Sequence, residues 1–172
     1  MKLPFAIILA CSLTVTVAPA YADDDSLPAD LAVRFSNISS IGGIAGFLDR
    51  AQDIVLNAMG FMGIPYRWGG SSPETGFDCS GFVQYVFRQA AGLLVPRSSF
   101  DQIRQGAVVA REELQAGDLV FFNTMRATAS HVGIYIGENR FIHAPSRGKT
   151  VEIVNFTDAY WQARYDGARR LQ

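Results

Sequence analysis

The chain offers one thiol and two imidazoles of the types that carry out nucleophilic catalysis. Cys79 lies in the sequence FDCSGF over 77–82, where a stretch rich in Gly, Pro and Ser gives way to an amphipathic helix. The dipole and the unpaired N–H groups at a helix N-terminus favour a thiolate and lower its pKa from about 8.5. We therefore interpret Cys79 as a candidate nucleophile, and the alternative is a small buried apolar residue.

The chain has two histidines, His131 and His143, and both fall in one predicted β-hairpin. If the loop is 137–139, counting outward places Gly133 opposite His143. The two histidines then share one face of the sheet as diagonal neighbours, roughly 5 to 8 Å apart at Cβ. A two-residue loop would place them on opposite faces, because a shift of one residue inverts the pattern. A shared face therefore requires an odd loop or a bulge.

Together, Cys79, His131 and His143 match the needs of thiol catalysis, provided that the histidine face packs against the Cys79 helix. His131 would take the proton of Cys79 and later protonate the leaving amine, while His143 would orient His131 through a hydrogen bond between the rings. Each histidine alone has the alternative of an ordinary strand residue. Zinc is a weaker alternative, because these positions lack the short-range ligand pairs common in zinc sites. We expect no metal and no cofactor.

The N-terminal segment predicts export. Lys2 precedes an apolar run over 3–18, and small residues lead to Ala22, which is followed by three aspartates. This pattern is typical of a signal peptide over 1–22. The alternatives are an uncleaved anchor and a lipoprotein signal in which Cys11 is lipidated, and either would attach the protein to a membrane. We expect a location in the periplasm or the cell envelope.

The remainder of the chain has the size of one domain. Residues 23–43 are rich in Asp, Ser and Gly and are expected to form a flexible tether, which leaves 44–172 as the folded domain. The formal net charge of −1 comes without a basic patch, which excludes a nucleic-acid-binding protein. Exported cysteines usually form disulfides, but Cys79 has no partner after residue 22. We expect a monomer whose unpaired thiol has a function.

Apolar periodicity indicates helices first and strands afterward. Apolar residues at steps of three and four predict helices over 44–60 and 79–91, and Ser98 is placed to cap a short helix that ends before Gly106. From Gly117 onward the period changes to two. Four short strands are predicted, at 119–122, 131–136, 140–144 and 150–154. This order indicates an α+β fold.

Four stretches of this sequence resemble the NlpC-type cell-wall peptidases of the papain-like cysteine peptidase superfamily, and the resemblance covers about residues 50 to 170. The stretches are PYRWGG at 65–70, DCSGFV at 78–83, GDLVFF at 117–122, and HVGIYIG at 131–137 followed by FIHA at 141–144. The resemblance implies a papain-like α+β fold, with the nucleophile helix packed on a C-terminal antiparallel sheet. It also implies a Cys-His-His triad at Cys79, His131 and His143.

The resemblance further implies hydrolysis of stem peptides in bacterial peptidoglycan. The bond typical of the family joins γ-D-glutamate to a diamino acid such as meso-diaminopimelate, and this is the bond that we expect the protein to cut. Small envelope endopeptidases of Gram-negative bacteria share the arrangement of leader, short tether and single domain, and some cut the D-alanyl–diaminopimelate cross-link instead. Two alternatives stay open, which are a non-catalytic wall-binding module and an acyltransferase of the same fold.

The resemblance also assigns residues around the nucleophile. Tyr66 would help form the oxyanion site together with backbone N–H groups at the start of the Cys79 helix. Asp78 and Ser80 would shape the substrate pocket, and Arg97 and Ser98 match a family segment and are substrate-binding candidates. The structural alternative for Tyr66 and Trp68 is that both are aromatic packing residues, and for Trp68 we prefer this interpretation. The structural alternative for Asp78 is a helix cap. Gln102 belongs to the same segment as Arg97, and no role follows for it.

Overall fold

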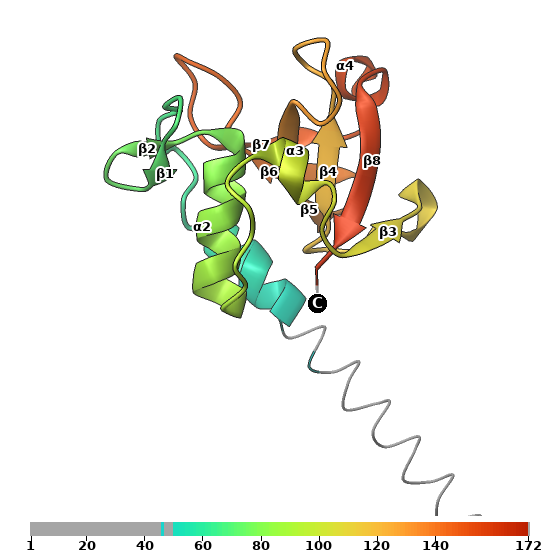
Figure 1. The fold of residues 1–172 in the computed structure, drawn as a ribbon, viewed down its shortest axis with the longest axis horizontal. Coiled ribbons are helices and arrows are strands. Elements are labelled where there is room, and N and C mark those ends of the chain that lie inside the picture. Colours follow the sequence, from blue (N-terminus) through green and yellow to red (C-terminus); the bar gives the residue numbers. More distant parts are fainter. Residues whose placement is uncertain (1–45, 47–49, 172) are drawn as a thin grey trace, which may run out of the picture. The chain divides into compact units, whose positions relative to one another are not determined.

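The computed structural model describes residue 46 and residues 50–171 of the 172-residue chain (Figure 1). The signal peptide and tether predicted over 1–43, including Cys11, lie outside the described residues. Every described residue belongs to one compact unit, Ser39–Gln172. Within the described part of the chain, no helix is both long enough and apolar enough to cross a membrane.

The helix that carries Cys79 has the predicted bounds. Residues 50–59 are helical, as expected, and a ribbon of β1 (Ser71–Ser72) and β2 (Gly76–Phe77) leads into α2 (Cys79–Ala91). Asp78 caps α2 by accepting a hydrogen bond from the Gly81 N–H at 2.7 Å. The helix ends at Gly92, whose φ of 65° is easily adopted by glycine and closes the last turn. The structure thus confirms the predicted start and stop of this helix.

The short helix after α2 is also confirmed. Ser98 caps α3 (Ser99–Gln102) by accepting a hydrogen bond from the Asp101 N–H. The chain then forms β3 (Ala107–Val109), which was not predicted, and a 3-10 turn, η1 (Arg111–Glu113).

The chain continues with the strands β4 (Leu119–Phe122), β5 (His131–Gly137), β6 (Arg140–His143) and β7 (Glu152–Asn155), the short helix α4 (Ala159–Gln162) and the strand β8 (Tyr165–Arg170). Together with β3, these strands form one antiparallel sheet of six strands in the order β3-β8-β4-β5-β6-β7. The four predicted strands are confirmed, the last of them beginning two residues later than expected. Strand β8 was missed, although it lies between β3 and β4. The α+β fold class is confirmed.

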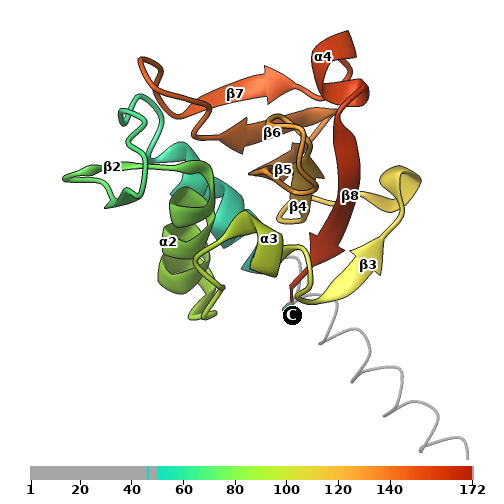
Figure 2. The same ribbon diagram turned by 45° about the horizontal axis from the view of Figure 1, so that its top comes forward.

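The two faces of the sheet carry different cores. The 50–59 helix and α2 lie beside one face in both ribbon views (Figure 2), and α2 packs there on Val132, Ile134 and Ile142. The other face carries a second cluster that includes Phe122 and Phe141. The nucleophile helix is therefore anchored by strands β5 and β6, the two strands that also carry the histidines.

Candidate active site

Cys79 is the first residue of α2 and is partly exposed, with no disulfide. Burial raises the pKa of its thiol to about 11, and the Asp78 carboxylate adds to this rise, while hydrogen bonds from the backbone of Val132 and Ser80 act in the opposite direction. The predicted lowering of the pKa by the helix terminus is therefore outweighed, because desolvation disfavours the charged form. The resting thiol is neutral, so an attacking thiolate requires a base that removes the proton.

The β5–β6 hairpin brings the two histidines together through a bulge. Its turn has two residues, Glu138 and Asn139, with φ of 50° and 54°. The register shifts by one residue between Tyr135 and Gly137, so that Ile134 faces Ile142 farther along the hairpin. The three-residue loop was thus wrong, but the bulge restores the predicted shared face of the histidines.

The two imidazoles form a buried hydrogen-bonded pair. His131 Nε2 lies 2.7 Å from His143 Nδ1, with the ring planes at 86° to each other. His131 is 4% exposed and His143 is fully buried. Burial lowers the pKa of His131 to about 4, and burial, with the charges of His131 and Lys149, holds the pKa of His143 well below its ordinary value. Both rings are therefore neutral at neutral pH, which leaves His131 able to act as a base.

Aromatic rings hold this pair in place on the face opposite to α2. Trp161 stacks on His131 at 5.7 Å and meets His143 edge-on at 5.1 Å, while Phe141 contacts His143. The expectation that the histidine face packs on α2 was wrong, because α2 covers the other face. A side chain at Gly133 would collide with the Phe141 ring, since an added Cβ would lie 2.5 Å from it. Trp161 was not predicted as a site residue, because the apolar residues around it follow neither a helical nor a strand period.

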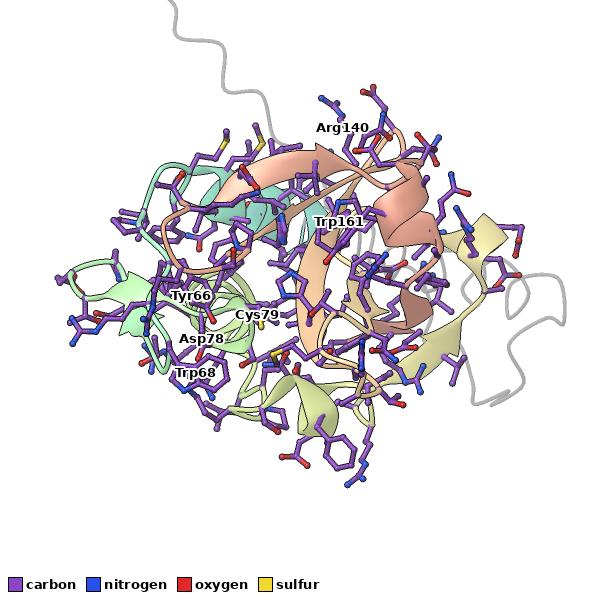
Figure 3. All side chains as sticks on the ribbon, turned by 90° about the horizontal axis from the view of Figure 1, so that it is seen from above. Tyr66, Trp68, Asp78, Cys79, Arg140 and Trp161 are labelled. Carbon is purple, nitrogen blue, oxygen red and sulfur yellow. The ribbon has the colours of Figure 1, made fainter. Side chains whose placement is uncertain are left out.

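Cys79 and His131 open into one groove of about 1070 Å³, and Tyr66, Asp78, Ser80, Arg97 and Ser98 also line it. His143 lies behind His131. Figure 3 shows Tyr66 and Asp78 around Cys79, with Trp68 and Trp161 on opposite sides of it. The packing interpretation of Trp68 was wrong, since this side chain is 72% exposed at the groove. That a ring nitrogen of His131 lies about 3 to 4 Å from the Cys79 Sγ stays a prediction.

The Tyr66 hydroxyl faces the nucleophile region in its protonated form. Burial raises the pKa of Tyr66, and the neighbouring Asp78 carboxylate raises it further. Its backbone N–H donates to the Lys149 carbonyl at 2.8 Å, which fixes it beside the groove. A protonated phenol at this position is a hydrogen-bond donor available to a developing oxyanion.

The carboxylate of Asp78 is fully engaged by the protein. Arg97 donates to Oδ1 at 2.9 Å and to Oδ2 at 2.7 Å, and the Gly69 N–H donates to Oδ2 at 2.9 Å. The same guanidinium reaches the Ser80 hydroxyl and the Gly70 carbonyl. Asp78 thus acts as the predicted helix cap, and with Arg97 it ties the start of α2 to the neighbouring loop. Asp78, Ser80 and Arg97 line the groove.

Two other polar residues of the segment have structural partners. The Ser98 hydroxyl donates to Asp101 at 2.6 Å in addition to capping α3. The fully buried Gln102 donates to the Ser80 carbonyl at 3.0 Å and to the Pro96 carbonyl at 2.8 Å. Gln102 therefore ties α3 to the nucleophile helix. Within the described part of the chain, no three His, Cys, Asp or Glu side chains are grouped so that they could hold a metal ion.

Acid should destabilise the fold through the buried histidines. Below about pH 6.5 the unfolded chain protonates both histidines, whereas folded His131 stays neutral until about pH 4. The free energy of unfolding should therefore fall as the pH drops through this window, by about 1.4 kcal/mol per pH unit for each histidine. Denaturant melts across the window measure the slope. The His143→Asn variant should show a shallower slope, and equal slopes would contradict this account.

Comparisons with known proteins agree with this geometry. The model of the NlpC/P60 family matches residues 63–170. Murein DD-endopeptidase MepH of Escherichia coli K12 is 44% identical over 72% of this chain and 47% of its own length. Gamma-DL-glutamyl hydrolase of Bacillus subtilis 168 is 47% identical over 69% of this chain and 29% of its own length. Murein DD-endopeptidase MepS/Murein LD-carboxypeptidase of Escherichia coli K12 is 36% identical over 96% of this chain and 86% of its own length.

Solved structures of the same family share this fold. A crystal structure of an NlpC/P60 family protein from Bacillus cereus ATCC 10987 superposes with a TM-score of 0.66 at 39% identity, covering 70% of this chain and 39% of that one. The chain spans less than half the length of MepH and of the gamma-DL-glutamyl hydrolase, and most of the length of MepS.

Proposed function

The chain belongs to the NlpC/P60 family, and from this premise we propose that it is a cysteine-type endopeptidase that hydrolyses stem peptides of bacterial peptidoglycan. The observation that carries the proposal is the buried pair of His131 and His143, joined at 2.7 Å, behind the groove into which the Cys79 thiol opens. In this pair the Nδ1 atom of His131 is left for the thiol. A neutral thiol beside a neutral imidazole is the resting state of a general-base mechanism.

In the proposed mechanism, His131 Nδ1 accepts the proton of Cys79 as Sγ attacks the scissile carbonyl carbon. The Tyr66 hydroxyl and the Cys79 N–H donate to the oxyanion of the tetrahedral intermediate. His131 then gives its proton to the leaving amine, and an acyl-thioester remains on Cys79. Water, activated by His131, attacks the thioester, which releases the second product and restores the thiol.

For the bond, we propose the D-alanyl–diaminopimelate cross-link, in place of the γ-D-glutamyl–meso-diaminopimelate bond expected from the sequence. The support is the similarity to MepH and to MepS, both named as murein DD-endopeptidases, and the coverage of 86% of MepS. The second candidate is the γ-D-glutamyl–meso-diaminopimelate bond, which the similarity to the gamma-DL-glutamyl hydrolase favours.

Mass spectrometry of muropeptides tests both bonds at once. Purified protein is incubated with cross-linked murein and with uncross-linked muropeptides, and the Cys79→Ser variant is the control. Cleavage of the cross-link converts dimeric muropeptides into monomers of unchanged stem, whereas γ-D-glutamyl cleavage leaves L-alanyl-D-glutamate on the glycan fragment. Products absent from the control identify the bond. An unchanged muropeptide profile in all samples would overturn the proposed function.

We further propose that residues 1–22 direct export to the periplasm or cell envelope, and that residues 23–43 tether the catalytic domain over 44–172. The support is the pattern of the leader together with a substrate that lies outside the cytoplasm. The mass of the protein recovered from the envelope separates the two processing routes, because cleavage after Ala22 yields an unmodified chain, whereas lipidation leaves Cys11 as a diacylated first residue.

A further inference from the structure

The hydrogen bond between the two imidazoles is compatible with two arrangements of protons. In the first, His131 carries its proton on Nε2 and donates to His143 Nδ1, which places the proton of His143 on Nε2. In the second, His143 donates from Nδ1, and His131 must carry its own proton on Nδ1. Only the first leaves His131 Nδ1 free to accept the proton of Cys79. Activity therefore depends on a group that favours a proton on Nε2 of His143.

Glu152 is placed to be that group. It faces His143 directly across the antiparallel pair of β6 and β7, so both side chains project from the same face. His143 Nε2 is fully buried and has no hydrogen-bond partner within the described residues. The nearest carboxylate oxygen, Glu152 Oε1, lies 3.9 Å away. Glu152 is partly exposed and lines the groove, so its side chain has room to approach the ring.

A cation competes for the same oxygen. Lys149 Nζ lies 3.5 Å from Glu152 Oε1, in the loop between β6 and β7. The charged or titratable groups that face His143 are thus His131 on β5, Glu152 on β7 and Lys149 on the loop. The Glu152 carboxylate favours a proton on His143, whereas the Lys149 ammonium disfavours it.

We propose that Glu152 is a positioning residue that acts through His143, selecting the ring tautomer that leaves His131 free to deprotonate Cys79, and that Lys149 moderates its effect. This role rests on the proposed function for its kinetic consequence. When the Cys79 proton moves to His131 Nδ1, the positive charge is shared with the ring pair, and the carboxylate stabilises it. The inference extends the triad by a fourth side chain on a neighbouring strand.

The tautomer is measured directly by ¹⁵N NMR of histidine-labelled protein at neutral pH, in the Cys79→Ser background to avoid oxidation. With Glu152 present, His143 should carry its proton on Nε2. In Glu152→Leu the Nε2-protonated fraction should fall, whereas Glu152→Gln, whose amide oxygen still accepts a hydrogen bond, should retain most of it. Glu138→Gln is the matched control, because Glu138 pairs with Arg140, and Arg140 lies away from Cys79 in Figure 3.

Kinetics on muropeptides with an intact Cys79 supply the second readout. Glu152→Leu should lower kcat about five- to tenfold with KM unchanged, and Glu152→Gln should recover part of this loss. The acid limb of kcat/KM should move to lower pH in Glu152→Gln and to higher pH in Lys149→Met, because the two charges act on His143 with opposite sign. A role in folding alone would not produce opposite shifts.

The two readouts separate the failure of this inference from the failure of the proposed function. If Glu152→Leu leaves both the tautomer of His143 and kcat unchanged, Glu152 has no positioning role. If no muropeptide is cleaved by the unmodified protein, the proposed function fails, and the NMR measurement alone decides the role of Glu152. Circular dichroism confirms that each variant is folded. If Glu152→Leu is not, Glu152→Met replaces it, because a thioether of similar length is at most a weak hydrogen-bond acceptor and carries no charge.

Discussion

Cys79→Ser is expected to abolish muropeptide cleavage, with a loss of kcat/KM of at least about 10³-fold. The serine hydroxyl is far less acidic than a thiol, and burial lowers the pKa of His131 to about 4, so its imidazole is a weaker base for this hydroxyl than an ordinary histidine. The fold should persist, because Cys79 forms no disulfide, and the cap of α2 comes from the Asp78 side chain. Chromatography of cleavage products measures the loss, and thermal melts check the fold.

Chemical modification provides an independent control for the same residue. Alkylation of the thiol should block cleavage, whereas a strong chelator should leave it unchanged. Cys79 is the one cysteine among the described residues, so a single alkyl adduct on that part of the chain is expected by mass. Full turnover by Cys79→Ser, or inhibition by the chelator alone, would contradict a cysteine mechanism.

The helices and central strands of this fold were predictable because their patterns are local. Asp78 and Gly92 bracket α2 as sequence rules require, and the apolar residues over 119–122 and 131–136 mark strands that are buried on both faces. Strand β8 was not predictable in this way. Its sequence, YDGARR, contains three charged residues and a glycine, and only Ala168 is buried.

Strand β8 pairs with β3 and β4 through its backbone, and a long-range ion pair also ties it to the start of β4. Asp118 is fully buried at the start of β4, and the Arg170 guanidinium donates to both of its oxygens at 2.7 Å. The two residues are 52 positions apart, so no local pattern joins them. A charged side chain, which is uncommon in a buried strand, here satisfies a buried carboxylate.

The candidate site was predictable in its residue types and less so in its surroundings. Cys79, His131 and His143 could be selected because the chain has so few thiols and imidazoles. The ion pair between Asp78 and Arg97 joins residues 19 positions apart, so no local pattern predicts it. Trp161 lies in a helix of four residues, which is too short to show a helical period of apolar residues. The raised pKa of Cys79 could not be foreseen, since it depends on how deeply the thiol is buried.

The roles of the two histidines should be separable, because one acts on the moving proton and the other acts through the first. His131→Ala should remove nearly all turnover, by about 10³-fold or more, since it removes the proposed general base. His143→Asn should retain a measurable fraction, because the amide oxygen can accept the hydrogen bond of His131 Nε2 in place of Nδ1. His143→Gln should behave similarly with a less well placed oxygen.

His143→Ala should be worse than either amide, because it removes the acceptor and leaves a cavity beside Trp161 and Phe141. Kinetics on purified muropeptides rank the four variants, and far-UV circular dichroism confirms that each is folded. The expected order of kcat is His143→Asn, then His143→Gln, then His143→Ala, with His131→Ala lowest. If His131→Ala retained more activity than His143→Gln, the assignment of base and orienting residue would be reversed, since only the group that receives the Cys79 proton is indispensable to the attack.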